Sequence, residues 1–135
     1  MFRLLTHGSC LGNPGRGAWA AQLIRPDGSE SIFAGSAERT TSTQMEVVAV
    51  SEGLERVPED EEVEVLTANA NIIGWLSRGW RRNNAILRPL LARADVLLAA
   101  RRVRFTLGHA VEARREVRRV KRCGGGQRDG GARGG

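Results

Sequence analysis

Apolar and polar residues alternate in three short segments near the start of the chain. The segments are FRLLT at 2–6, AWAAQLI at 18–24 and SIFAG at 31–35, and stretches rich in glycine and proline separate them. Alternation between turn-forming residues is typical of strands that pair through hairpins. The pattern therefore predicts three consecutive antiparallel strands.

The hydrophobic period changes after these strands. Within 43–57, apolar residues recur at spacings of three and four, which predicts an amphipathic helix. The recurring residues are Val47, Val50, Leu54 and Val57. Ser42 or Thr43 lies just ahead of them and can cap the N-terminus of this helix.

Strands and helices alternate from there to residue 122. The expected segments are a strand at 63–67, helices at 70–79 and 84–100, a strand at 101–108 and a helix at 111–122. Pro89 marks either the first turn of its helix or a break in it. The last helix has only Val111, Val117 and Val120 as apolar positions. We expect one domain over 1–122 and a disordered tail at 123–135, because the glycine-rich tail cannot build a core.

The positive charge is concentrated at the C-terminal end. Residues 1–110 carry 13 basic and 12 acidic residues, whereas residues 111–135 carry 8 and 3, which gives net charges of +1 and +5. Twenty of the 21 basic residues are arginine. Because guanidinium groups pair with phosphate in a bidentate way, a polyanion is the natural partner of this end. An arginine-rich genome is the alternative explanation.

The lengths of the apolar runs and the spacing of the cysteines indicate the cellular compartment. No apolar run approaches the roughly 18–20 residues of a membrane span, and the N-terminus lacks the apolar core of a signal peptide. We therefore expect a cytoplasmic protein with no membrane partner. Cys10 and Cys123 have no neighbours at metal-ligand spacing, so we expect free thiols.

Five short strings lie at the joints between these expected elements. They are HGSCLGNPGRG at 7–17, TTSTQMEVVAV at 40–50, LTANA at 66–70, GWLSRGW at 74–80 and LGHA at 107–110. Together they resemble type 1 ribonuclease H, over residues 2 to about 120. The resemblance implies an α/β fold with a five-stranded mixed sheet flanked by helices. Its element order is strand, strand, strand, helix, strand, helix, helix, strand, helix, as the periodicity also predicts.

The resemblance also implies a position for each catalytic residue. Members of the family cleave the RNA strand of RNA/DNA hybrids with two divalent cations held by four carboxylates, since hard cations such as Mg²⁺ prefer anionic oxygen. The four positions fall on His7, Glu46, Ala68 and Arg119. Only Glu46 is a carboxylate, although Glu116 is an alternative to Arg119. His109 corresponds to the family's proton-shuttle histidine.

Three interpretations of His7 remain open at this point. It is a polar residue at a strand end, a phosphate contact, or a ligand of a different metal site. In the second case, Arg119 and protonated His7 would neutralise phosphate in place of the metals. In the third, His7, Glu46 and His109 would converge to bind Zn²⁺ or Mn²⁺.

The resemblance implies a duplex-binding surface as well. Cys10 and Asn13 stand at positions of minor-groove contacts, where RNA displays its 2′-hydroxyl groups. The expected binding residues of the first and last helices are Ser42, Thr43, Gln44, Arg114, Arg115 and Arg118. Trp75 and Trp80 are expected to pack in the core and rim, or one of them against a deoxyribose.

These observations favour a monomeric ribonuclease H-like protein that binds RNA/DNA hybrid, or a related duplex, with little or no cleavage. One alternative is a metal-dependent ribonuclease H that uses Mg²⁺ or Mn²⁺ at a rearranged site. The other is a protein-interaction module without catalytic activity on the same fold.

Overall fold

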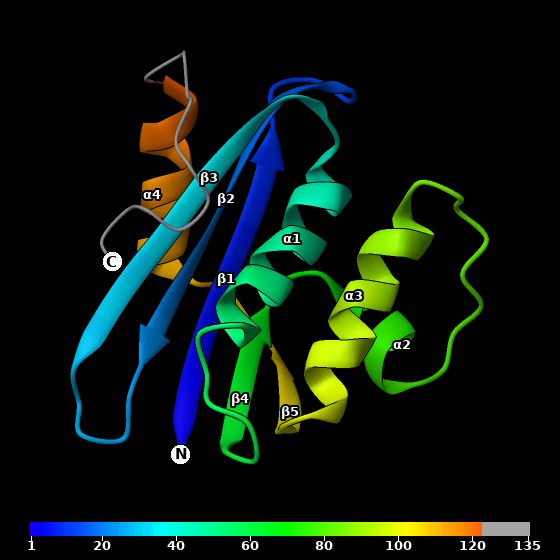
Figure 1. Ribbon diagram of the computed structural model, residues 1–135. Helices are drawn as coiled ribbons and strands as arrows, with labels where there is room; N and C mark the ends of the chain where they lie inside the picture. The colour runs from blue at the N-terminus through cyan, green and yellow to red at the C-terminus, as the bar shows by residue number, and fades with distance from the viewer. Residues whose placement is uncertain (123–135) are drawn as a thin grey trace.

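The expected elements form in the expected order in the structure, a computed structural model that describes residues 1–122 (Figure 1). They are β1 (Phe2–Cys10), β2 (Gly15–Ile24), β3 (Glu30–Thr40), α1 (Ser42–Leu54), β4 (Glu62–Thr67), α2 (Ala70–Ser77), α3 (Leu87–Ala99), β5 (Arg102–Leu107) and α4 (Val111–Arg122). The tail expected at 123–135, with Cys123, lies outside the described residues. Within the described residues, no helix is both long enough and apolar enough to cross a membrane.

The five strands form one mixed sheet in the order β3-β2-β1-β4-β5. β1, β2 and β3 pair antiparallel, as the alternating segments predict. β4 pairs parallel to β1, and β5 pairs parallel to β4. The central position of β1 brings its side chains between elements on both faces of the sheet.

The helices cover the two faces unequally. α1 packs on β1 and β2, and α3 packs on α1, so both lie on one face, while α4 packs on β1, β2 and β3 from the other (Figure 1). The predicted stripe of α1 is fully buried in the larger core, and Val57 lies just beyond the helix end. The N-cap is Thr41, whose side-chain oxygen accepts a hydrogen bond from the Gln44 amide at 3.2 Å, so the expectation of Ser42 or Thr43 was wrong.

Small side chains on the sheet form the surface against which α4 packs. Ala18, Ala20 and Ala34 of the sheet are fully buried against this helix, together with Ala110, Ala113, Val117 and Val120. Alanines on the sheet let the helix approach closely, which compensates for its few large apolar residues. Val111 is 61% exposed and Ala113 is buried instead, because position 113 is in register with 117 and 120.

The observed bounds of β1 and α3 determine where His7 and Pro89 lie within their elements. β1 continues to Cys10, so His7 lies inside a paired strand, opposite Ala20, and not at a strand end. Pro89 is the third residue of α3 and therefore belongs to its first turn, where a missing amide hydrogen has no cost.

Candidate nucleic-acid interface

Strand β1 presents different residues to the two helical layers. In the antiparallel ladder, His7 pairs with Ala20 and Ser9 pairs with Ala18. Directly paired residues share a face of the sheet, so His7 and Ser9 face α4. Gly8 lies between them and faces α1: a Cβ there would stand 2.4 Å from the backbone carbon of Met45. Glycine at this position thus allows the start of α1 to touch β1.

A cavity of about 290 Å³ opens between β1 and α4, and we call it the cationic cavity. It is lined by His7, Ser9, Arg114, Val117, Arg118 and Lys121. Arg114, Arg118 and Lys121 are spaced by four and three residues, so one face of the helix carries all three cations. Lys121 Nζ donates a hydrogen bond to Ser9 Oγ at 2.8 Å, which fixes the ammonium group against the strand.

The surroundings of His7 keep its imidazole neutral near pH 7. Burial lowers the pKa of His7 to about 4, and the positive charges of Arg114 and Lys121 add to the effect, followed by His109 and Arg118. The lowered pKa does not favour a protonated His7 in the free protein near pH 7. The positive charge at this place comes from the side chains of α4.

Arg119 and Glu116 lie outside the residues that line the cationic cavity. Arg119 Nη2 donates to Glu116 Oε2 at 2.6 Å, and its Nε donates to Oε1 at 3.2 Å. The helical period explains this arrangement, since neither residue is in register with the three cations. Arg115, another expected phosphate contact, is 70% exposed in its side chain and pairs with Glu112 at 3.1 Å.

Glu46 has a separate environment on the α1 side of the sheet. Asn69 Nδ2 donates a hydrogen bond to Glu46 Oε1 at 2.8 Å. Burial raises the pKa of the Glu46 carboxyl, and the hydrogen bond from Asn69 opposes that rise. Asn69 follows Ala68 at the end of β4, and its Oδ1 caps α2 through the Asn71 amide at 2.9 Å. Asn69 was not among the expected site residues, although an asparagine directly before a helix is typical of an N-cap.

The donor groups present do not fit a site for two divalent cations. Within residues 1–122, no three side chains of the His, Cys, Asp and Glu types gather closely enough to hold a metal ion. His7, Glu46 and His109 therefore do not form the expected metal-binding group, although His109 lies near enough to His7 to lower its pKa. Three cations stand beside His7, and a divalent cation would be repelled there.

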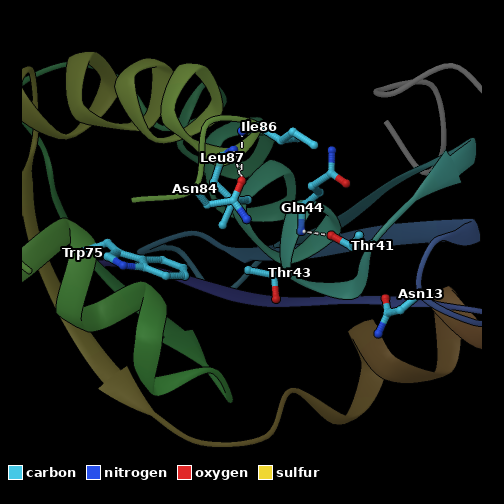
Figure 2. A pocket seen from close by; sticks show the side chains of 8 residues that line it. All are labelled: Asn13, Thr41, Thr43, Gln44, Trp75, Asn84, Ile86 and Leu87. Carbon is cyan, nitrogen blue, oxygen red and sulfur yellow. Dashed lines mark hydrogen bonds between the residues drawn. The ribbon is translucent and has the colours of Figure 1, made fainter. Parts of the chain in front are cut away.

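A second cavity, of about 380 Å³, lies on the α1 side, and we call it the polar groove (Figure 2). It is lined by Asn13, Thr41, Thr43, Gln44, Trp75, Asn84, Ile86 and Leu87. Figure 2 shows Asn13 and Trp75 at opposite ends of this group, with Thr43 between them. The groove thus brings together Asn13, Thr43 and Gln44, which the resemblance implied as duplex contacts, with Trp75.

Two other expected contacts, Ser42 and Cys10, support the groove without lining it. Asn13 Oδ1 accepts a hydrogen bond from the Ser42 amide at 3.1 Å, which ties the β1–β2 loop to the start of α1. Cys10 Sγ donates to Thr40 O at 3.2 Å and to Gly15 O at 3.4 Å, so its thiol closes the base of the same loop. Cys10 is a free cysteine, as expected.

Sequence reasoning missed Ser9 and Lys121 in the cationic cavity. Both signals were present: alternation along β1 places Ser9 on the same face as His7, and helical spacing places Lys121 in line with Arg114 and Arg118. In the polar groove, the residues expected from the sequence did not include Thr41, Asn84 or the apolar wall formed by Ile86 and Leu87. Asn84 Oδ1 accepts hydrogen bonds from the amides of both apolar residues, at 2.8 and 3.1 Å.

The strand order and the two helical layers define an α/β domain with the ribonuclease H fold. The RNase H1 of Halobacterium salinarum NRC-1 has a TM-score of 0.70 and 25% identity, covering 86% of this chain and 89% of that one. LC11-RNase H1, solved in complex with RNA/DNA hybrid, has a TM-score of 0.76 and 20% identity, covering 87% and 93%. These neighbours confirm the predicted fold.

Sequence comparisons identify the family. Residues 2–111 match the family described as RNase H. A ribonuclease H of Thermus thermophilus is 36% identical over 139 residues, covering 86% of this chain and 81% of that protein. A ribonuclease H of Methylorubrum extorquens is 36% identical over 121 residues, and the match covers 81% of this chain and 53% of that protein. The chain belongs to the ribonuclease H family, as the five strings indicated.

Proposed function

We propose that this protein binds RNA/DNA hybrid, or a closely related duplex, and cleaves it slowly or not at all. The observation that carries the proposal is the cationic cavity. Metal-dependent hydrolysis at this place needs anionic ligands, whereas Arg114, Arg118 and Lys121 present three positive charges beside His7. Three of the four family carboxylate positions lack a carboxylate in this chain.

The two cavities support contact with a duplex. Ser9 lines the cationic cavity and Asn13 lines the polar groove, so the end of β1 and the loop after it lie between the two. Hydroxyl and amide groups of the groove suit the minor groove of a hybrid, and cations suit its phosphates. In this arrangement the groove contacts the sugar edges while the cationic cavity contacts a backbone phosphate.

Glu46 favours a second candidate function, a metal-dependent ribonuclease H with a rearranged site. Its carboxylate occupies a family position and offers oxygen ligands for a cation, while Asn69 Nδ2 donates a hydrogen bond to it at 2.8 Å and holds it in place. Mg²⁺ or Mn²⁺ would be the cation in that case. Within the described residues, no three His, Cys, Asp or Glu side chains gather to hold a metal ion, which is why binding is the primary proposal.

Hybrid binding with and without metal tests the proposal. We expect fluorescence anisotropy to show that the full chain binds a labelled hybrid of about 12 base pairs equally well in Mg²⁺ and in a chelator. The affinity should fall linearly with salt on a logarithmic plot, because phosphate contacts release counterions. Binding lost in the chelator would favour the metal-dependent enzyme. Absence of salt-dependent binding would favour a protein-interaction module.

The polar groove provides a specific variant for the same assay. Thr43→Val keeps the size of the side chain and removes its hydroxyl from the groove. We expect it to reduce the preference for hybrid over DNA duplex of the same sequence, since a hydroxyl can contact the RNA 2′-hydroxyl. Thr106→Val is the matched control, because Thr106 lies on β5, where its hydroxyl donates to Glu64 Oε2 at 2.7 Å. An unchanged preference in Thr43→Val would remove the groove from the proposal.

A further inference from the structure

We propose that the cationic cavity is a binding site for one backbone phosphate, held by direct charge pairing where the family's enzymes use metal ions. The inference rests on the proposed function for the identity of the ligand, a nucleic-acid phosphodiester. Independent observations of geometry and charge support the cavity as an anion-binding site.

The first observation is the absence of compensating charge. None of the six residues that line the cavity is acidic. Within residues 1–122, no ion pair joins Arg114, Arg118 or Lys121 to a carboxylate, whereas the neighbouring Arg115 and Arg119 pair with Glu112 and Glu116. The two kinds of arginine alternate along α4: Arg114 and Arg118 are exposed beside the cavity and have no ion pair within the described residues, whereas Arg119 pairs with the mostly buried Glu116.

The second observation is the way the cations are held. Lys121 Nζ is fixed by Ser9 Oγ at 2.8 Å, and a hydroxyl leaves the ammonium charge uncompensated. Arg114 and Arg118 lie one helical turn apart on the same side, and planar guanidinium groups suit the oxygens of a phosphate. Three cations close together repel one another, and a bound anion removes this repulsion. The pKa of His7 is lowered first by burial, and the positive charges of Arg114 and Lys121 lower it further.

The third observation is size. The cavity has a volume of about 290 Å³, far above the roughly 10–15 Å³ of such volume that one water molecule needs. The cavity therefore accommodates one phosphate group with part of its hydration shell. Ser9 adds a hydroxyl that can hydrogen-bond to a phosphate oxygen, and the neutral His7 ring can do the same through a nitrogen-bound hydrogen.

The test combines variants of the cavity with a variant of equal charge elsewhere. Arg118→Gln and Lys121→Gln each remove one positive charge from the cavity. Arg102→Gln removes the same charge at the start of β5, at the opposite end of the sheet, where Arg102 Nη2 bonds to Asp60 O at 3.1 Å. Lys121→Arg keeps the charge. Urea denaturation of each full-length variant establishes that it is folded.

Hybrid binding should separate these variants. We expect Arg118→Gln and Lys121→Gln to weaken binding by about fivefold to tenfold at low salt, and to reduce the slope of the salt plot by about 1. Lys121→Arg should keep the wild-type slope, and Arg102→Gln should stay within about twofold of wild type. The slope is decisive, because a structural disturbance lowers affinity without removing one phosphate contact from the plot.

Inorganic phosphate provides a probe that does not depend on hybrid binding. In nuclear magnetic resonance spectra at constant ionic strength, phosphate should shift the signals of His7, Ser9 and Arg118 saturably, and chloride should not. Arg118→Gln should weaken this response. Phosphate shifts in a protein that binds no hybrid would support the anion site and refute the proposed function.

Two results would overturn the inference. One is wild-type affinity and slope in both cavity variants, which would leave hybrid binding intact and place it elsewhere. The other is the absence of any phosphate shift at His7, Ser9 and Arg118.

Discussion

Acidification should destabilise this protein through His7. In the folded chain, burial and the cations of α4 hold the pKa of His7 at about 4, whereas the ordinary value is 6.5. Between these two pH values the unfolded chain binds a proton at His7 more readily than the folded chain does. The contribution of neutral His7 to stability is therefore complete above about pH 6.5 and is lost as the pH falls toward 4.

The size of the loss follows from the two pKa values. The interval from about 4 to 6.5 corresponds to at most about 3.4 kcal/mol, at about 1.36 kcal/mol per pH unit. Water reaches part of the half-buried ring and screens the cations, so we expect about 1–2 kcal/mol. The raised pKa of Glu46 acts in the opposite direction: its ionisation lowers stability as the pH rises above the ordinary value of 4.5.

A variant that cannot titrate isolates the contribution of His7. Urea denaturation at constant ionic strength, followed by tryptophan fluorescence, gives the free energy of unfolding of wild type and His7→Gln at several pH values. Glu46 affects both proteins alike, so it cancels in the difference between them. From about pH 7.5 to about pH 4.5, wild type should lose about 1–2 kcal/mol more than His7→Gln. Parallel curves would refute the lowered pKa of His7 in the folded protein.

Three further substitutions test contacts of β1, the start of α1 and Glu46. Gly8→Ala should destabilise the protein by about 1–3 kcal/mol in urea denaturation, because the new methyl group would overlap the backbone of α1; a smaller loss would show that this contact is loose. Thr41→Ala should cost about 1 kcal/mol through the lost N-cap, and Thr43→Ala, its control, should cost less; equal losses would contradict the cap assignment. Asn69→Ala should raise the pKa of Glu46 further, as measured by carboxyl nuclear magnetic resonance, while an unchanged pKa would mean that the amide does not act on the carboxylate.

The fold was predictable because each element carries its own local signal. Alternation in β1 to β3, the stripe of α1 and the five strings give the element order, and the resemblance gives a five-stranded mixed sheet; the order of the strands in that sheet comes from the structure. The boundaries were less predictable, since the ends of β1 to β3 are set by pairing with neighbouring strands. Because of that pairing, His7 lies in the middle of a ladder and not at the expected strand end.

The candidate site was only partly predictable, for a related reason. Family motifs indicate which position a residue occupies, but the face of a helix decides what it contacts. Arg119 matched the family position, yet the register of α4, set by Val117 and Val120 against the sheet, turns Arg118 and Lys121 toward β1. The neutral state of His7 depends on this packing, so the sequence alone could not give it.

The most direct test of the central claim is a single-turnover cleavage assay. Protein in excess over an end-labelled RNA/DNA hybrid is incubated in Mg²⁺ and separately in Mn²⁺, and the products are separated on a denaturing gel. A native gel on the same samples measures binding, and Glu46→Gln controls for contaminating nuclease. We expect a bound and intact hybrid in both metals. Cleavage by wild type that disappears in Glu46→Gln would contradict this expectation and show a working site built around Glu46.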